Sequence, residues 1–223
     1  MLTSTADNGK HKIDFGLHGV PTVSQFVQRD AEMRELERLL FDNATATYRQ
    51  KVVVLYGLGG IGKTQVAAEF ARKHYSRFSS VTWLDGSSEA SLKQSFAAMV
   101  QRLPQNELTA DKVEMLKHST VAADVDVAVR ECLRWLSLPT NRHWLLIFDN
   151  VDRDFHNADD PQAYDVKAYL PSTGYGSVLI TSRLARLQRH GLGVKIGTVN
   201  AEQARAMLEN NARRRVEGEL TIA

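Results

Sequence analysis

Residues 57–64 read Gly-Leu-Gly-Gly-Ile-Gly-Lys-Thr, an octet that matches the pattern G-x-x-x-x-G-K-[ST]. Glycines at this spacing let a loop turn its backbone N–H groups inward around an anion, because no Cβ atom obstructs the turn. Lys63 adds a mobile positive charge, and Thr64 adds a hydroxyl of the kind that ligates Mg²⁺. The octet therefore predicts a loop that wraps the phosphates of a nucleotide, with Lys63 on the β- and γ-oxygens.

The segments on either side of the octet support this interpretation. Residues 51–56, Lys-Val-Val-Val-Leu-Tyr, are a β-branched, apolar run that predicts a buried strand. After the octet, residues recur at helical spacing, namely Val66, Ala67, Phe70, Ala71 and His74. The positive end of that helix would point at the bound phosphate. Glycine-rich octets that arise by chance in loops lack this order of strand, loop and helix.

A carboxylate follows another apolar run. Residues 144–148, Trp-Leu-Leu-Ile-Phe, predict a third buried strand, and Asp149 comes directly after it. Ligands of open α/β sheets bind at the carboxyl ends of the strands. Asp149 can therefore hold a Mg²⁺ ion together with Thr64, directly or through water. A helix cap is the structural alternative for an aspartate at this position.

Hydrolysis needs a group that orients water, usually an acid beside the metal ligand. The residue after Asp149 is Asn150, whose amide cannot accept a proton, and Asp152 lies two positions further on. Residues 177–182, Ser-Val-Leu-Ile-Thr-Ser, predict a fourth strand that ends at Arg183. Arg183 can reach a γ-phosphate and distinguish ATP from ADP, or it is an ordinary surface arginine. The candidate catalytic residues are thus Lys63, Asp149, Asn150 and Arg183.

Composition excludes several classes of protein. The 223 residues carry 28 basic and 26 acidic side chains, a formal charge of +2, so nothing demands a nucleic-acid partner. A single cysteine, Cys132, cannot form an internal disulfide. No signal sequence opens the chain, and its apolar runs are too short to cross a bilayer. We expect a cytoplasmic protein without a membrane or nucleic-acid partner.

The remaining periodicity completes an α/β pattern. Strands are predicted at 51–56, 80–84, 144–148, 177–182 and 194–199, and helices from Asp30, after the octet, up to Pro104, at about 123–137 and from about Ala201. Parallel neighbours need helical crossovers, so this alternation predicts a parallel sheet with helices on both faces. We expect a tail or linker over 1–22, a nucleotide-binding domain over 23–200, and a C-terminal helix over 201–223 that begins a helical region.

With these segments placed, the chain resembles the NB-ARC family of signal-transducing ATPases, a STAND class of P-loop NTPases that includes plant resistance proteins and the apoptotic protease-activating factor of animals. Four segments carry the resemblance: Phe26-Val27-Gln28-Arg29, the octet, Leu-Leu-Ile-Phe-Asp-Asn at 145–150, and Gly-Ser-Val-Leu-Ile-Thr-Ser-Arg at 176–183. Residues 83–90, Trp-Leu-Asp-Gly-Ser-Ser-Glu-Ala, are most similar to fungal NOD-like receptors. The resemblance covers about residues 22–215.

The resemblance implies a five-stranded sheet of order 5-1-4-3-2 and a nucleotide, ADP or ATP, bound with Mg²⁺. It implies that Val27 and Arg29 border the adenine, although the residues alone indicate only a loop residue and a solvated charge. It implies that Arg183 senses the terminal phosphate. The remaining nucleotide-binding residues would be Gly57, Gly59, Gly60, Ile61, Gly62, Lys63, Thr64 and Gln65, with Thr64 and Asp149 on the metal.

Two departures from the family pattern bear on activity. Gln28 stands where most relatives have the glycine before the arginine, a departure that bears on the adenine contact. Asn150 replaces the second acid of many relatives, so at most slow hydrolysis is expected. The resemblance implies a nucleotide switch in innate immunity or programmed cell death. Its partners would be effector and sensor-repeat domains of a longer protein, with nucleotide-dependent self-association. The alternatives are an efficient ATPase motor or small-molecule kinase, and a degenerate scaffold that does not use nucleotide.

Overall fold

The computed structural model describes residues 29–41, 50–104, 107–108, 123–153, 155, 160–199 and 204–205. The predicted tail over 1–22 and Val27 lie outside these residues. Of the helix predicted from about Ala201, only Ala204 and Arg205 are described, and both are helical.

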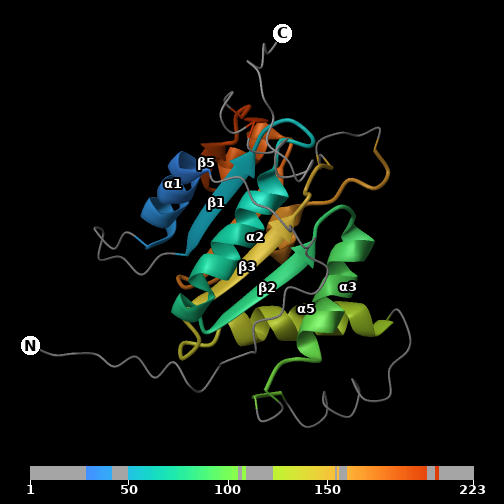
Figure 1. Ribbon diagram of the computed structural model, residues 1–223. Coiled ribbons are helices and arrows are strands. Elements are labelled where there is room, and N and C mark those ends of the chain that lie inside the picture. Colours follow the sequence, from blue (N-terminus) through green and yellow to red (C-terminus); the bar gives the residue numbers. More distant parts are fainter. Residues whose placement is uncertain are drawn as a thin grey trace, which may run out of the picture.

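Five parallel strands form one sheet (Figure 1). The strands are β1 (Lys51–Tyr56), β2 (Ser80–Asp85), β3 (Trp144–Asp149), β4 (Ser177–Ser182) and β5 (Leu192–Lys195). Their spatial order is β2-β3-β4-β1-β5, which confirms the predicted order 5-1-4-3-2. The carboxyl ends of β1, β3 and β4 therefore lie at one edge, where the octet, Asp149 and Arg183 follow.

The fifth strand differs from the prediction in its position. Apolar alternation indicated 194–199, whereas β5 covers Leu192–Lys195. Close approach of the backbone conceals its start. A Cβ at Gly191 would lie 2.2 Å from the carbonyl oxygen of Val52, and a Cβ at Gly193 would lie 2.2 Å from Oε1 of Gln188. Glycine is needed at position 191, where the neighbouring atoms are backbone, and neither glycine has the propensity that signals a strand.

Within the described ranges, four α-helices pack against the sheet: α1 (Asp30–Phe41), α2 (Lys63–His74), α3 (Glu89–Val100) and α5 (Ala123–Leu136). Short 3-10 helices follow α2 and flank β4: η1 (Tyr75–Arg77), η3 (Val166–Tyr169) and η4 (Ala185–His190). The side chain of Ser88 caps α3 by accepting a hydrogen bond from the N–H of Ser91 at 3.1 Å. In the described part of the chain, none of the helices has the length and apolar character that crossing a membrane requires.

Alternating side chains of the strands build a hydrophobic core on each face of the sheet. Val53 and Leu55 of β1 pack on one face with Phe70 of α2. Val54, between them, packs on the other face with Trp135 of α5. Helices α1 and α2 thus cover one face, with α2 in front of the sheet in Figure 1, and α3 and α5 cover the other. The sheet edge that carries the site is held rigid between two cores.

Gly176, just before β4, offers a test of this packing. Its φ is 73°, in the left-handed region, and a Cβ there would lie 2.2 Å from the Trp144 ring. Gly60 has a φ of 74°, but a Cβ there would meet nothing within 4 Å. We expect Gly176→Ala to lower the free energy of unfolding by about 2–4 kcal/mol, from backbone strain plus overpacking. Gly60→Ala should lower the free energy of unfolding by about 1 kcal/mol, from backbone strain alone.

Urea denaturation of the two variants measures this difference in the free energy of unfolding. Equal losses in Gly176→Ala and Gly60→Ala would contradict the close contact between Gly176 and Trp144.

Candidate functional site

The octet forms a loop between β1 and α2 in which three glycines have positive φ angles. Gly57, Gly60 and Gly62 have φ angles of 155°, 74° and 98°. A Cβ at Gly57 would lie 2.5 Å from the carbonyl oxygen of Ile196, so packing requires glycine at that position. A Cβ at Gly60 would meet open space, and one at Gly62 would lie 3.7 Å from Oε1 of Gln65. The loop is thus closed on the β5 side and open at Gly60.

Lys63 is the first residue of α2, and its ammonium group lies over the loop. Its Nζ donates hydrogen bonds to the carbonyl oxygens of Gly57 at 3.1 Å and Leu58 at 2.8 Å. Burial lowers the pKa of Lys63 below its ordinary value, although the carboxylates of Asp152 and Asp149 oppose this change. The two carbonyl acceptors are neutral, so the charged oxygens of a phosphate would compete well for the ammonium group.

Thr64 and Asp149 meet, as the sequence predicts for a shared cation. Oγ1 of Thr64 donates to Oδ1 of Asp149 at 2.9 Å, and Oγ1 of Thr181 donates to the same oxygen at 2.6 Å. Burial raises the pKa of Asp149, the two threonine hydrogen bonds act against this rise, and the carboxylates of Asp85 and Asp152 add to it. A hydroxyl beside a carboxylate supplies the hard oxygen ligands that Mg²⁺ prefers.

Thr181 is a residue of this site that the sequence analysis missed. Its Oγ1 accepts a hydrogen bond from the N–H of Asn150 at 2.9 Å, and its carbonyl oxygen accepts one from the N–H of Val151 at 2.9 Å. Thr181 therefore positions both Asp149 and the turn that follows it. Threonine within an apolar strand usually indicates strand propensity alone. The parallel register of β3 and β4, which pairs Phe148 with Ile180, is the signal that would identify it.

Asn150 occupies an exposed turn directly after the metal-ligand candidate. Its φ is 66°, and among the residues that the structure describes it is the only non-glycine residue with a positive φ. Asparagine tolerates this left-handed conformation better than most residues do. The turn therefore has a backbone reason for Asn150, and the amide still offers no proton acceptor beside Asp149.

Arg183 lies along the phosphate loop, where its position after β4 predicts it. A Cβ at Gly59 would be 3.6 Å from Cζ of Arg183. The arginine is also held by a carboxylate: its backbone N–H donates to Oδ1 of Asp152 at 2.7 Å, and its Nε pairs with Oδ2 at 2.6 Å. Asp152 is thus the partner of Arg183 at the edge of the sheet.

Arg29 is buried, with 4% of its surface exposed, and is therefore not the solvated charge that its residue type alone indicates. Its guanidinium donates to the carbonyl oxygens of Ile61 at 2.8 Å and Gly197 at 2.9 Å, and it pairs with Glu32 at 3.2 Å. Arg29 therefore ties the start of α1 to the phosphate loop and to the segment after β5. Val27, the other residue expected near the adenine, lies outside the described residues.

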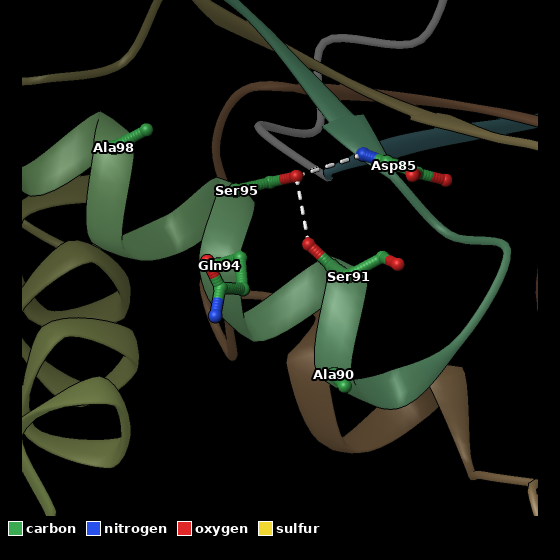
Figure 2. A pocket seen from close by; sticks show the side chains of 6 residues that line it. All are labelled: Asp85, Ala90, Ser91, Gln94, Ser95 and Ala98. Atoms are coloured by element: carbon green, nitrogen blue, oxygen red, sulfur yellow. Dashed lines mark hydrogen bonds between the residues drawn. The ribbon is translucent and has the colours of Figure 1, made fainter. Parts of the chain in front are cut away.

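A separate hollow of about 580 Å³ lies on α3 beside the end of β2 (Figure 2). Ser95 links the two elements: its Oγ accepts a hydrogen bond from the N–H of Asp85 at 3.0 Å and donates one to the carbonyl oxygen of Ser91 at 3.0 Å. Asp85 stands opposite Asp149 in the register of β2 and β3. The hollow is lined by Asp85, Ala90, Ser91, Gln94, Ser95 and Ala98, none of them in the phosphate loop.

Solved structures share the fold at low sequence identity. Cdc6p from Pyrobaculum aerophilum superposes with a TM-score of 0.54 at 12% identity, over 89% of this chain and 52% of that one. The Aeropyrum pernix ORC1 protein, solved in complex with DNA, gives 0.52 at 18% identity, over 87% and 51%. The Aeropyrum pernix ORC2 protein, solved as ADPNP and ADP complexes, gives 0.51 at 13%, over 91% and 56%. These identities show the fold alone.

Comparison at the level of sequence identifies the family of the chain. Residues 25–172 match the model of the AAA ATPase domain. Over 185 residues the chain is 26% identical to a nucleotide-binding leucine-rich repeat (NLR)-like protein of Hyaloscypha variabilis, a match that covers 79% of this chain and 17% of that protein. The chain thus spans about half the length of the similar structures and a smaller part of the NLR-like protein. It belongs to the AAA ATPase domain family, and it is similar to an NLR-like protein, which agrees with the resemblance drawn from the sequence.

Proposed function

We propose that this chain is a nucleotide switch domain that binds ADP or ATP together with Mg²⁺ within an NLR-like signalling protein. The observation that carries the proposal is the 2.9 Å hydrogen bond between Thr64 and Asp149 beside a glycine loop that is open at Gly60. The phosphate-loop residue and the strand-end carboxylate, far apart in sequence, have the arrangement that a shared cation requires.

Several contacts among the described residues support a diphosphate site. The first N–H groups of α2 have no intrahelical partner, as in every helix, and would be available to an anion bound at the loop. Lys63 would bind the β- and γ-oxygens, and Thr64 and Asp149 would hold Mg²⁺, which neutralises charge on the phosphoryl oxygens when bound. Arg29, through Ile61 and Gly197, supports the loop from the side on which the resemblance expects the adenine. Gln65 and Ile61 complete the proposed contact set.

The switch would respond to the terminal phosphate. A ligand shifts a conformational equilibrium only through contacts that differ between the two states. Arg183 lies beside Gly59, which supports a role for this residue in telling ATP from ADP. Asn150 cannot accept a proton, so hydrolysis would be slow. Roles in innate immunity or programmed cell death, a cytoplasmic location, and self-association with effector and sensor domains follow from the NLR-like resemblance and belong to this proposal.

ADP should stabilise the folded chain, because a ligand that binds only the folded state raises the free energy of unfolding. At ADP concentrations about 100 times the dissociation constant, with Mg²⁺ present, we expect the Tm to rise by about 5–10 °C. Lys63→Ala should abolish most of this rise. Lys73→Ala is the matched control: Lys73 lies at the other end of α2, 55% exposed and paired with Glu37, and its loss should leave the rise intact.

Thermal melts with ADP and with ATP measure these shifts. A wild-type chain that neither nucleotide stabilises would favour a scaffold that does not use nucleotide. Phosphate release well above about 1 s⁻¹ would favour an efficient motor or kinase instead.

Asp149 is also expected to limit stability. Its pKa is raised by burial, so the folded state binds the proton more tightly than the unfolded state, and stability falls as the pH rises through the folded pKa. Asp149→Asn keeps an oxygen for Thr64 and Thr181 while removing the charge. We expect its Tm to exceed that of the wild type at neutral pH by about 2–4 °C, and the gain to shrink at acidic pH.

The same variant should lose the Mg²⁺-dependent part of ADP binding.

Asp160→Asn is the control for the gain in Tm. The N–H of Gln162 and the guanidinium of Arg153 lower the pKa of Asp160, so removing the charge of Asp160 should bring no gain in Tm. A lower Tm for Asp149→Asn at neutral pH would contradict the cost assigned to its buried charge.

A further inference from the structure

We infer that Asp152 sets the preference of this site between ADP and ATP, because it holds the guanidinium of Arg183 that a terminal phosphate would also bind. The inference rests on the proposed nucleotide function and adds a residue that the phosphate-loop pattern and the strand-end aspartate do not include. Asp152 would be a positioning residue, acting on the nucleotide through Arg183.

The contact between the two residues uses both carboxylate oxygens. Oδ1 of Asp152 accepts the backbone N–H of Arg183 at 2.7 Å, and Oδ2 pairs with Nε at 2.6 Å. Oγ of Ser182 lies 3.4 Å from Oδ1 as a weaker donor. The side chain of Asp152 is 18% exposed and that of Arg183 is 63% exposed. The carboxylate is therefore the fixed partner, and the guanidinium is the partner free to move.

The backbone around Asp152 is anchored to β4. The N–H of Val151, which is 1% exposed, donates to the carbonyl oxygen of Thr181 at 2.9 Å. The carbonyl oxygen of Val151 accepts a hydrogen bond from Oγ of Ser182 at 2.5 Å. These bonds hold the backbone next to Asp152 in place, so a turn of Arg183 toward a ligand would pull the guanidinium away from the carboxylate.

The ion pair lies beside the phosphate loop. Arg183 lies 3.6 Å from the position of a Cβ on Gly59, in the middle of the phosphate loop. Lys63, the proposed ligand of the β- and γ-oxygens, lies within the electrostatic influence of both Asp152 and Arg183. A γ-phosphate on Lys63 would therefore compete with Asp152 for the same guanidinium, whereas ADP, which lacks this group, would leave the pair closed.

The competition is between similar interactions. Guanidinium groups form charge-assisted hydrogen bonds of comparable kind with carboxylates and with phosphates. Because the pair is partly exposed, breaking it has a modest effect, about two- to fivefold in affinity. Such a penalty would apply to ATP and hardly to ADP, and it would bias the resting chain toward the ADP-bound form.

Calorimetric titration with Mg²⁺-ADP and with the non-hydrolysable β,γ-imido analogue of ATP tests this assignment in four chains: wild type, Asp152→Asn, Arg183→Ala and the double variant. In Asp152→Asn we expect the analogue to bind about two- to fivefold more tightly and ADP to change by less than about twofold. Arg183→Ala should weaken the analogue more than ADP. In the double variant, where Arg183 is already alanine, Asp152→Asn should give little further gain in affinity for the analogue, because the two residues act as one unit.

Asp160→Asn is the matched control. Asp160 pairs with Nη1 of Arg153 through both carboxylate oxygens at 3.1 Å, on the segment that also carries Asp152. Its loss removes a comparable ion pair without touching Arg183 and should leave the ratio of the two affinities unchanged. If Asp152→Asn fails to fold, Asp152→Ser replaces it, since its hydroxyl accepts the same backbone N–H.

Three results would overturn the inference. An unchanged affinity ratio in Asp152→Asn would show that the pair does not select the nucleotide. A gain that persists in full in the Arg183→Ala background would show that Asp152 repels the phosphate directly and does not act through Arg183. If neither nucleotide binds to the wild type, the proposed function fails together with this inference. The first two results, in contrast, overturn the inference alone, because they require that nucleotide binds.

Discussion

One hydrogen bond, from Oγ1 of Thr64 to Oδ1 of Asp149 at 2.9 Å, joins the two halves of the candidate site. Thr64 follows the loop after β1, and Asp149 ends β3. Strands β1 and β3 are not neighbours, because β4 lies between the two in the sheet. Thr181, at the end of β4, donates to the same carboxylate oxygen at 2.6 Å and bridges the gap. The site therefore exists only in this strand order, which brings the ends of three strands to one edge.

This arrangement has an energetic consequence. The carboxylate of Asp149 is kept partly buried near the carboxylates of Asp85 and Asp152, and the ammonium group of Lys63 is desolvated over the loop. Both features oppose stability in the free chain. The two hydrophobic cores on either face of the sheet supply the compensating burial. Rigid support of this kind also keeps the side chains in place for a ligand.

Local patterns in the sequence predicted those parts of the fold that local forces determine. Residues 51–56 and 177–182 form strands at the predicted bounds, because β-branched runs bordered by glycine leave little choice of structure. The start of β5 escaped prediction because Gly191 and Gly193 have low strand propensity, and the close contact of Gly191 with the backbone of Val52 is visible only in the folded chain.

The residues of the candidate site also divide into those with a local sequence signal and those without one. The octet and Asp149 carry their chemistry in their residue types, so the sequence was enough to pair them. Thr181 depends on the register of β3 with β4, and the ion pair between Asp152 and Arg183 depends on where two turns meet, so neither has a local signature. Burial of Arg29 follows from its contact with Ile61, on a segment remote in sequence.

The most direct test of the shared cation site is the Mg²⁺ dependence of ADP affinity in the wild type and in Thr64→Val, a substitution that removes the hydroxyl but keeps the side-chain shape. Titration calorimetry with and without Mg²⁺ measures it. The account predicts that Mg²⁺ tightens ADP binding by the wild type and has little effect on binding by Thr64→Val. An equal effect of Mg²⁺ on both chains would contradict it.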